Sequence, residues 1–341
     1  MKVGQTKVGC MFGTTSRTAT ATMVAVMSLV AIGSAQTYTT FELPNAEFTE
    51  PWAINSAGVI VGYYGRPDHG FLRETDGTLV TFDGPLQTGT IPQAINPAGQ
   101  IAGYYTGDTV PHGFLREPDG TFISFDIPGS SGTFASGINP AGKIAGFYFD
   151  STRIHAFVRT REGTFNTFDV DGSIYTLAWA INPAGQVTGD YIDPSLRVHG
   201  FLRETNGTLA TFEIPGSTIT FPRALNPAGE VTGEYSDTYG HSHGFLRKTD
   251  GSLITFDAPG SLDTNPTAIN PAGQVIGNYN DGNSHTHGFV RATNGIFTTF
   301  DVPGSIDTYP QAISPAGDIT GSYSIGILEF SGFLRSSRKH H

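Results

Sequence analysis

The sequence is poor in cysteine and has no long apolar segment. Cys10 is the only cysteine among 341 residues. The one strongly apolar run, Met23 to Ile32, is about half of the ~20 residues that a membrane-spanning helix needs. We therefore expect neither a disulfide framework nor an association with a membrane.

The first 35 residues have the pattern of a secretory signal peptide. Basic residues without an acidic residue come first, and the small residues Gly33-Ser34-Ala35 follow the apolar run. We expect export to the cell exterior or the periplasm. The mature chain would start near Gln36 and lack Cys10, which leaves no thiol chemistry.

Basic residues are also scarce. The chain has 19 Lys and Arg against 30 Asp and Glu, and its net charge is −11 at pH 7. This charge argues against nucleic acid as a partner. The 44 Gly and 21 Pro are too few for a disordered chain, and 24 Phe with 13 Tyr supply material for a core. Long helical periodicity is absent, so we expect an all-β protein.

The sequence is dominated by a repeat. An Asn recurs after an apolar pair at steps of 41 to 44 residues, and Ser314 takes its place in the seventh unit. A period of this length is typical of a solenoid or a propeller. The repeated residues are Asn55, Asn96, Asn139, Asn182, Asn226 and Asn270.

Each unit contains two turn signals. In the second unit, Asn96-Pro97-Ala98-Gly99 suits a type I turn with Pro second and Gly fourth, and Asp119-Gly120 favours a tight hairpin. Short runs rich in apolar and aromatic residues lie between these turns. Each unit is therefore predicted to be a four-stranded antiparallel meander, which is one propeller blade.

The two ends of the repeat complement each other. Residues 38–44 match the fourth strand of a unit, whereas the chain ends after Gly332-Phe333-Leu334-Arg335, a third strand. An open solenoid has no reason to omit a strand at one end and supply it at the other. We predict a single seven-bladed β-propeller over residues 36–336, closed by its N-terminal strand and followed by a basic tail at 337–341.

These motifs resemble a known group. His155-Ala156-Phe157, the Gly-Phe-Leu-Arg segments of other units and the Ala-Ile-Asn…Gly-x-Ile-x-Gly-x-Tyr run are similar to the HAF-type extracellular repeat family of bacteria. The resemblance covers essentially the whole mature chain. The resemblance implies an exported repeat protein, but it assigns no activity to any particular residue.

Residues that recur in every unit are expected to build the scaffold, because every blade needs the same packing. A Phe closes the fourth strand, and an Arg that closes the third strand is expected to pair with the acid after that Phe. A His that opens the third strand is expected to bond to an acid or a hydroxyl, and a Tyr closes the second strand. The columns are Phe41, Phe82, Phe125, Phe168, Phe212, Phe256 and Phe300; Arg73, Arg116, Arg159, Arg203, Arg247, Arg291 and Arg335; Glu42, Asp83, Asp126, Asp169, Glu213, Asp257 and Asp301; His69, His112, His155, His199, His243 and His287; and Tyr64, Tyr105, Tyr148, Tyr191, Tyr235, Tyr279 and Tyr323.

Positions where the repeats disagree are where a single site must be encoded. Two columns vary: the residue before each Ala-Ile-Asn and the residue before each repeated Tyr. We expect both near one mouth of the central channel, on the face with the longer loops. The columns are Trp52, Gln93, Ser136, Trp179, Arg223, Thr267 and Gln311, and Tyr63, Tyr104, Phe147, Asp190, Glu234, Asn278 and Ser322.

Two loops hold candidate metal ligands. His241-Ser242-His243 and His285-Thr286-His287 each place a second His two residues before the repeated one. Alternate residues of a strand point to one side, a geometry that can bind zinc, and nearby carboxylates could hold calcium. A hydrophilic loop has the same composition. Apart from such a cation we expect no cofactor.

The leading functional hypothesis is binding without catalysis, by a monomer, of an extracellular glycan or another macromolecule such as a protein. No nucleophile elbow, zincin helix, phosphate loop or nucleotide fingerprint occurs. The alternative is a polysaccharide-active enzyme with a site on units four to six. It would be either a lyase using His and Tyr, with Arg neutralising a uronate, or a glycosidase using Asp190 and Glu234. A structural coat element is a third class. The expected ligand-binding residues are Trp52, Tyr63, Tyr104, Trp179, Arg223, His241 and His285.

Overall fold

The computed structural model describes residues 28–29, 36–87, 89–106, 110–326 and 329–336. All regular secondary structure within these ranges is β-strand, as the sequence predicted. The described residues contain no helix long and apolar enough to cross a membrane. Nearly all of the expected signal peptide and the whole basic tail lie outside the described residues.

The first six repeat units each form four consecutive antiparallel strands, and the seventh supplies three. Strands begin and end close to the turn signals of the sequence. The units are β3 (Thr49–Ile54), β4 (Ile60–Tyr64), β5 (His69–Arg73) and β6 (Leu79–Phe82); β7 (Thr90–Ile95), β8 (Ile101–Tyr105), β9 (His112–Arg116) and β10 (Phe122–Phe125); β11 (Gly132–Ile138), β12 (Ile144–Phe149), β13 (Ile154–Arg159) and β14 (Phe165–Phe168); β15 (Tyr175–Ile181), β16 (Val187–Ile192), β17 (Val198–Arg203) and β18 (Leu209–Phe212); β19 (Ile219–Leu225), β20 (Val231–Ser236), β21 (Ser242–Arg247) and β22 (Leu253–Phe256); β23 (Asp263–Ile269), β24 (Val275–Asn280), β25 (Thr286–Arg291) and β26 (Phe297–Phe300); and β27 (Asp307–Ile313), β28 (Ile319–Gly326) and β29 (Glu329–Ser336).

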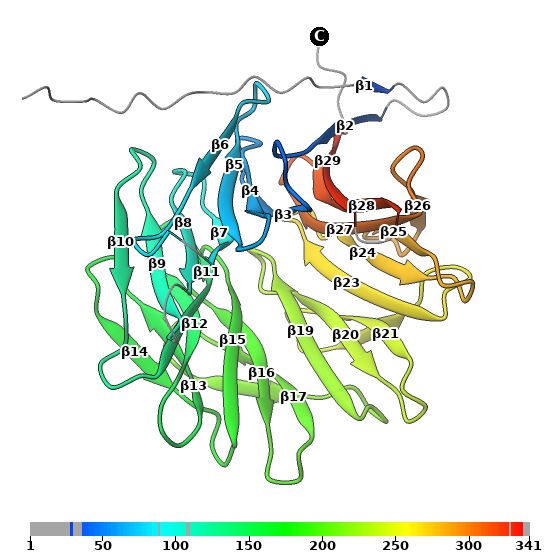
Figure 1. The fold of residues 1–341 in the computed structure, drawn as a ribbon. Coiled ribbons are helices and arrows are strands. Elements are labelled where there is room, and N and C mark those ends of the chain that lie inside the picture. The colour runs from blue at the N-terminus through cyan, green and yellow to red at the C-terminus, as the bar shows by residue number, and fades with distance from the viewer. Residues whose placement is uncertain (1–27, 30–35, 88, 107–109, 327–328, 337–341) are drawn as a thin grey trace, which may run out of the picture.

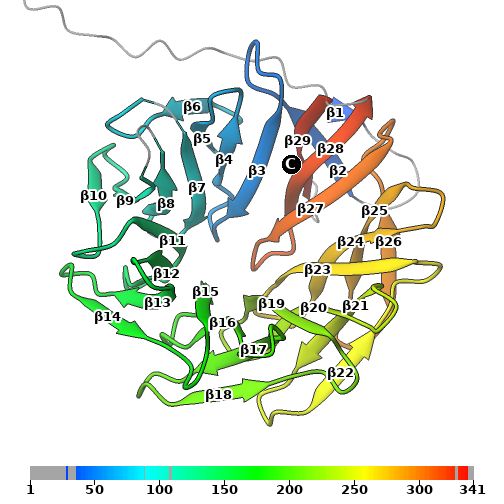
Figure 2. The ribbon, with the colours of Figure 1, turned by 60° about the horizontal axis from the view of Figure 1, so that its bottom comes forward.

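The units are arranged around a central axis, with the first strand of each unit innermost (Figures 1 and 2). Strands β3–β6, β7–β10 and β23–β26 form separate four-stranded sheets. Strands β11 to β22 form one 12-stranded sheet, because single parallel pairs join neighbouring units at Ile154↔Tyr175 and Val198↔Ile219. This is the architecture of a β-propeller.

The N-terminal segment lies in the sheet that contains the C-terminal strands. Strand β2 (Thr37–Phe41) pairs antiparallel with β29, from Thr37↔Ser336 to Phe41↔Gly332, in the place of a fourth strand. A two-residue strand, β1 (Ser28–Leu29), pairs with the outer edge of β2. On the other side, β3 contacts β27, β28 and β29, so the first and last units are neighbours.

The repeated Phe of the fourth strand links each unit to the next. In the second unit, the ring of Phe125 packs on Gly113 of its own third strand so closely that a Cβ there would lie 2.4 Å from the ring. The guanidinium of Arg159, from the next unit, lies 4.8 Å from the centre of the same ring. The corresponding Arg–Phe distance in the seven units ranges from 4.5 to 5.3 Å.

The expected pairing of the Arg column with the acid column is wrong. The arginines stack on Phe rings instead, where a cation is attracted to the face of the ring. Within the described residues the acids pair with the His column, for example Asp83 with His69 at 2.8 Å. Burial lowers the pKa of the guanidinium in Arg159, and its buried Nε has no hydrogen-bond partner. The Arg column therefore acts mainly through packing.

A second link follows the repeated Asn. The Asn96 side chain accepts hydrogen bonds from the backbone N–H groups of Ala98 and Gln100 in its own turn, and its Nδ2 donates to the carbonyl of Asn139 at 3.2 Å. Asn55, Asn139 and Asn182 make the same donation to the next unit. The residue that identified the repeat in the sequence thus shapes a turn and joins neighbouring units.

Deletion of residues 36–46 should strongly destabilise the protein. Tyr38, Phe41 and Leu43 are all buried, and each buried side chain of this size contributes about 1.5–3 kcal/mol. We expect the melting temperature to fall, and to recover partly when a peptide of residues 36–46 is added. An unchanged melting temperature in differential scanning calorimetry would show that this strand does not hold the two ends together.

Candidate functional site

The first variable column lines a cavity on the central axis. In every unit the pairing of the first two strands shifts by one residue at this column, as between Pro51 and Ala53 around Trp52. Such a β-bulge leaves one residue unpaired and redirects its side chain. The same shift occurs in each of the other six units. All seven bulged residues contribute to the cavity: Trp52, Gln93, Ser136, Trp179, Arg223, Thr267 and Gln311.

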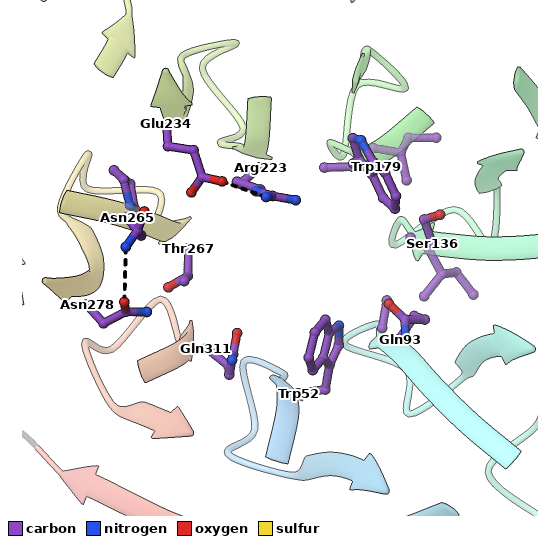
Figure 3. Close-up of a pocket in the computed structure, with 16 residues that line it drawn as sticks. Trp52, Gln93, Ser136, Trp179, Arg223, Glu234, Asn265, Thr267, Asn278 and Gln311 are labelled. Carbon is purple, nitrogen blue, oxygen red and sulfur yellow. Dashed lines mark hydrogen bonds and ion pairs between the residues drawn. The ribbon is translucent and has the colours of Figure 1, made fainter. Parts of the chain in front are cut away.

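The cavity has a volume of about 610 Å³ and different chemistry on its two sides. Figure 3 shows Glu234, Arg223, Asn265 and Asn278 on one side and the two tryptophans with Gln93 and Ser136 on the other. It lies deeper than expected. Trp52 is the fourth of six residues in β3, three residues before the Asn-containing turn, so this column lies inside the channel and not at the mouth.

An ion pair dominates the polar side. The guanidinium of Arg223 donates to a Glu234 carboxylate oxygen at 2.6 Å and lies 5.1 Å from the Phe221 ring centre. The Arg223 side chain is 40% exposed and that of Glu234 only 16%. Close by, the Asn265 amide donates to the Asn278 amide oxygen at 3.4 Å. The guanidinium of Arg223 offers hydrogen-bond donors to the cavity and the carboxylate of Glu234 offers an acceptor, and the two opposite charges cancel.

Aromatic rings form a continuous wall on the other side. The Tyr104 and Phe134 ring centres are 4.8 Å apart, Phe134 and Phe147 are 4.9 Å apart, and Phe147 and Trp179 are 5.3 Å apart. Trp52 and Tyr63 meet at 6.2 Å. These rings, with Ile91 and Ala135, enclose an adjoining cavity of about 370 Å³ that shares Trp52, Gln93, Ser136, Trp179 and Arg223 with the larger one.

Tyr63 is fixed in this wall by a hydrogen bond. Its hydroxyl donates to the Glu50 carboxylate at 2.6 Å. Burial, and then this bond and the negative charge of Glu50, raise the pKa of Tyr63 well above its usual value. Tyr63 is therefore a neutral donor already engaged with Glu50.

Asp190 lies behind the cavity wall. It is 3% exposed, it accepts a hydrogen bond from the indole Nε1 of Trp179, and it is not among the described residues that line either cavity. Burial raises the pKa of Asp190 to about 6, although the Trp179 bond and the charge of Arg223 act in the opposite direction. The structure therefore gives Asp190 a direct contact that orients Trp179.

The histidines expected from the sequence lie elsewhere. The ring of His243 stacks on Tyr235 with centres 5.1 Å apart, and its Nδ1 lies 2.8 Å from Asp257. Burial lowers the pKa of His243, but its hydrogen bonds to Asp257 and Asp237 outweigh that effect and raise it. The His–acid contact recurs in the six units that have a His, which confirms that this column bonds to an acid.

The other two histidines of the His-x-His pairs are loop residues. His241 lies 3.7 Å from Asp263, and the backbone N–H of His285 donates to Asp281. Among the described residues, no group of three or more His, Cys, Asp or Glu side chains is placed to hold a metal ion. Neither loop histidine lines the two axial cavities.

Sequence reasoning missed one column of the site. Asn265 and Phe134 lie two residues before the bulged residue, in a column that has six different residue types in the seven units. The period of two within a strand would have pointed to it. The bulge also had a signal, since Pro precedes the bulged residue in five units, and Pro inside a sheet is confined to edges and bulges.

Comparisons with known proteins give a fold. No protein-family profile and no curated protein matches the chain. Among solved structures, virginiamycin B lyase from Staphylococcus aureus matches with a TM-score of 0.61 and 13% identity, over 88% of this chain and 99% of that chain. The β-propeller domain of the Trilobed protease from Pyrococcus furiosus matches with a TM-score of 0.62 and 9% identity, over 86% and 95%. TolB from Acinetobacter baumannii matches with a TM-score of 0.50 and 15% identity, over 85% and 63%. At these identities the likeness shows the fold alone, an all-β propeller.

The raised pKa of Asp190 predicts a pH-dependent stability. Because the pKa of Asp190 is higher in the folded than in the unfolded protein, protonated Asp190 stabilises the fold. This stabilisation is present at and below pH 4 and is lost as the pH rises through about 6. The shift from 3.8 corresponds to about 3 kcal/mol. Between pH 4 and pH 7, the free energy of unfolding of Asp190→Asn should therefore rise by up to this amount relative to that of the wild type. Urea unfolding measures both. Parallel curves for the two proteins would contradict the assignment.

Proposed function

We propose that this protein is an exported, seven-bladed β-propeller that binds an extracellular glycan in its central cavity without catalysing a reaction. The observation that supports this most is the convergence of two tryptophans, several amides and the Arg223–Glu234 pair on one cavity of about 610 Å³. A cavity of this size, with apolar walls and a few convergent polar groups, is typical of a ligand site.

The two sides of the cavity complement the two faces of a sugar. The flat, apolar face of a pyranose can pack on an indole ring, here Trp52 or Trp179. Its hydroxyl groups need donors and acceptors in fixed positions, which Arg223, Glu234 and the amide side chains provide. Because Arg223 is already neutralised by Glu234, an uncharged sugar fits better than a uronate.

The architecture supports the proposal in its finer details. Pairing of β2 with β29 and the contacts of β3 with the last unit favour a ring closed by the N-terminal strand. The signal-like leader favours secretion, and the repeat motifs favour membership of the HAF-type family. We further propose a monomer that binds a glycan, with a protein as the other macromolecular partner to be tested.

An enzyme is the second candidate, on the strength of one observation. Asp190 has a pKa of about 6, which is suitable for a general acid, and Glu234 lies in the next unit. The solved structures of similar fold include a lyase. Against this, Trp179 already bonds to Asp190, which lies behind the wall, and Arg223 already pairs with Glu234. The arrangement favours holding a ligand over transferring a proton.

If the protein only binds its ligand, replacing a tryptophan of the cavity should weaken that binding. Trp52 and Trp179 are the only tryptophans in the chain and both line the cavity, so intrinsic fluorescence reports on ligand directly. After a glycan array has identified the best ligand, Trp179→Ala should weaken its affinity by about tenfold or more in calorimetry, as expected for an aromatic anchor. Glu234→Gln should weaken it too.

Two outcomes separate the candidates. If the protein turns over a polysaccharide and Asp190→Asn or Glu234→Gln lowers turnover by roughly 10²–10⁴-fold while binding survives, the protein is an enzyme and the binding proposal is wrong. If Trp179→Ala and Glu234→Gln both bind with wild-type affinity, the ligand lies elsewhere on the propeller.

A further inference from the structure

The axial site consists of two adjoining chambers, of which the smaller is the more apolar. The larger, of about 610 Å³, has Arg223, Glu234, Asn265, Asn278 and Gln311 in its wall, and we call it the polar chamber. The smaller, of about 370 Å³, is walled mainly by Tyr63, Ile91, Tyr104, Phe134, Ala135 and Phe147, and we call it the aromatic chamber. Both are bordered by Trp52 and Trp179, so one ligand can reach from one into the other.

We propose that the ligand is a sugar ring joined directly to an aromatic or similarly apolar group. The sugar occupies the polar chamber and the apolar group the aromatic chamber. The proposal rests on the proposed glycan-binding function and narrows it, because a plain oligosaccharide would fill only the polar half of the site.

Polar groups have little to bond with in the aromatic chamber. Apart from Gln93, Ser136 and Arg223, which it shares with the polar chamber, its walls are aromatic rings and aliphatic side chains, and the hydroxyl of Tyr63 already donates to Glu50. A second sugar placed there would lose water from its hydroxyls with few partners in return, at a cost of about 1–3 kcal/mol for each unpaired group. An apolar group has no such cost and gains by leaving water.

The space and the ring geometry suit an aromatic group. An apolar cavity of about 150 Å³ is large enough to bind benzene, and the aromatic chamber is more than twice that size. Tyr104 meets Phe134 edge to face, with ring planes at 62°. A guest ring can continue this series of edge and face contacts, which aromatic pairs prefer.

The test compares matched sugars with and without an aromatic group. Methyl and phenyl glycosides of glucose, galactose, mannose, xylose and N-acetylglucosamine, as both anomers, are titrated into the protein by calorimetry, with phenol alone as a further probe. For at least one sugar we expect the phenyl glycoside to bind about tenfold or more tightly than the methyl glycoside, and phenol to bind far more weakly than either.

Variants then locate the preference. Tyr104→Ala removes part of the aromatic wall and Ile91→Trp fills the chamber, and each should reduce the phenyl-over-methyl ratio towards one while the methyl glycoside binds as before. Tyr104→Phe keeps the ring and should keep the ratio. Tyr309→Ala is the matched control, because Tyr309 lies on an innermost strand but is not among the described residues that line either chamber.

Each result has a distinct meaning. Equal affinity for methyl and phenyl glycosides overturns the two-chamber proposal and leaves glycan binding intact. Phenol binding as tightly as phenyl glycosides, or no binding by any probe, overturns both. A phenyl preference that survives in Ile91→Trp and in folded Tyr104→Ala places the apolar group elsewhere and overturns the two-chamber proposal.

Discussion

The structure depends on the contact of one Phe ring with two neighbours. The Phe that ends each fourth strand packs between the third strand of its own unit, at a glycine in six of the seven units, and an arginine of the next unit. In six units a Cβ at that glycine would lie 2.3–2.8 Å from the ring, so a larger residue there would force the ring to shift. The third unit has Ala156 there instead. Because Phe41 makes the same contacts with Gly332 and Arg73, one interaction both stacks the units and joins the two ends of the chain.

This scaffold determines where specificity can be encoded. Packing fixes the third and fourth strands, and the Asn ladder fixes the turn after the first strand. The innermost strand forms a ladder only with the second strand of its own unit, apart from the single parallel pairs Ile154↔Tyr175 and Val198↔Ile219, and its bulged residue makes no regular ladder contact. That position is free to differ between units, so the seven side chains that face the axis, from Trp52 to Gln311, form an asymmetric site on a repetitive frame.

The sequence was sufficient to predict what repeats. Turn signals located the strands, and the missing fourth strand predicted the pairing of β2 with β29. The variable column containing Trp52 and Trp179 was found because it breaks the repeat. The partners of the repeated arginines were not predictable: the pattern allowed Arg159 to pair with an acid, but the structure places it on an adjacent Phe ring. Nor could periodicity show that Asp190 turns behind Trp179, because that depends on the local bulge and on burial.

The central claim is that the fold resides in the repeated residues and ligand recognition in the bulged column. It is tested most directly by making that column uniform: Trp52, Ser136, Trp179, Arg223 and Thr267 are all replaced by Gln, which already stands at positions 93 and 311. At position 179 the amide of Gln can still donate to Asp190. Calorimetry should show cooperative unfolding close to that of the wild type and no binding of any glycan that the wild type binds. Retained binding, or loss of cooperative unfolding, would contradict the separation of scaffold from site.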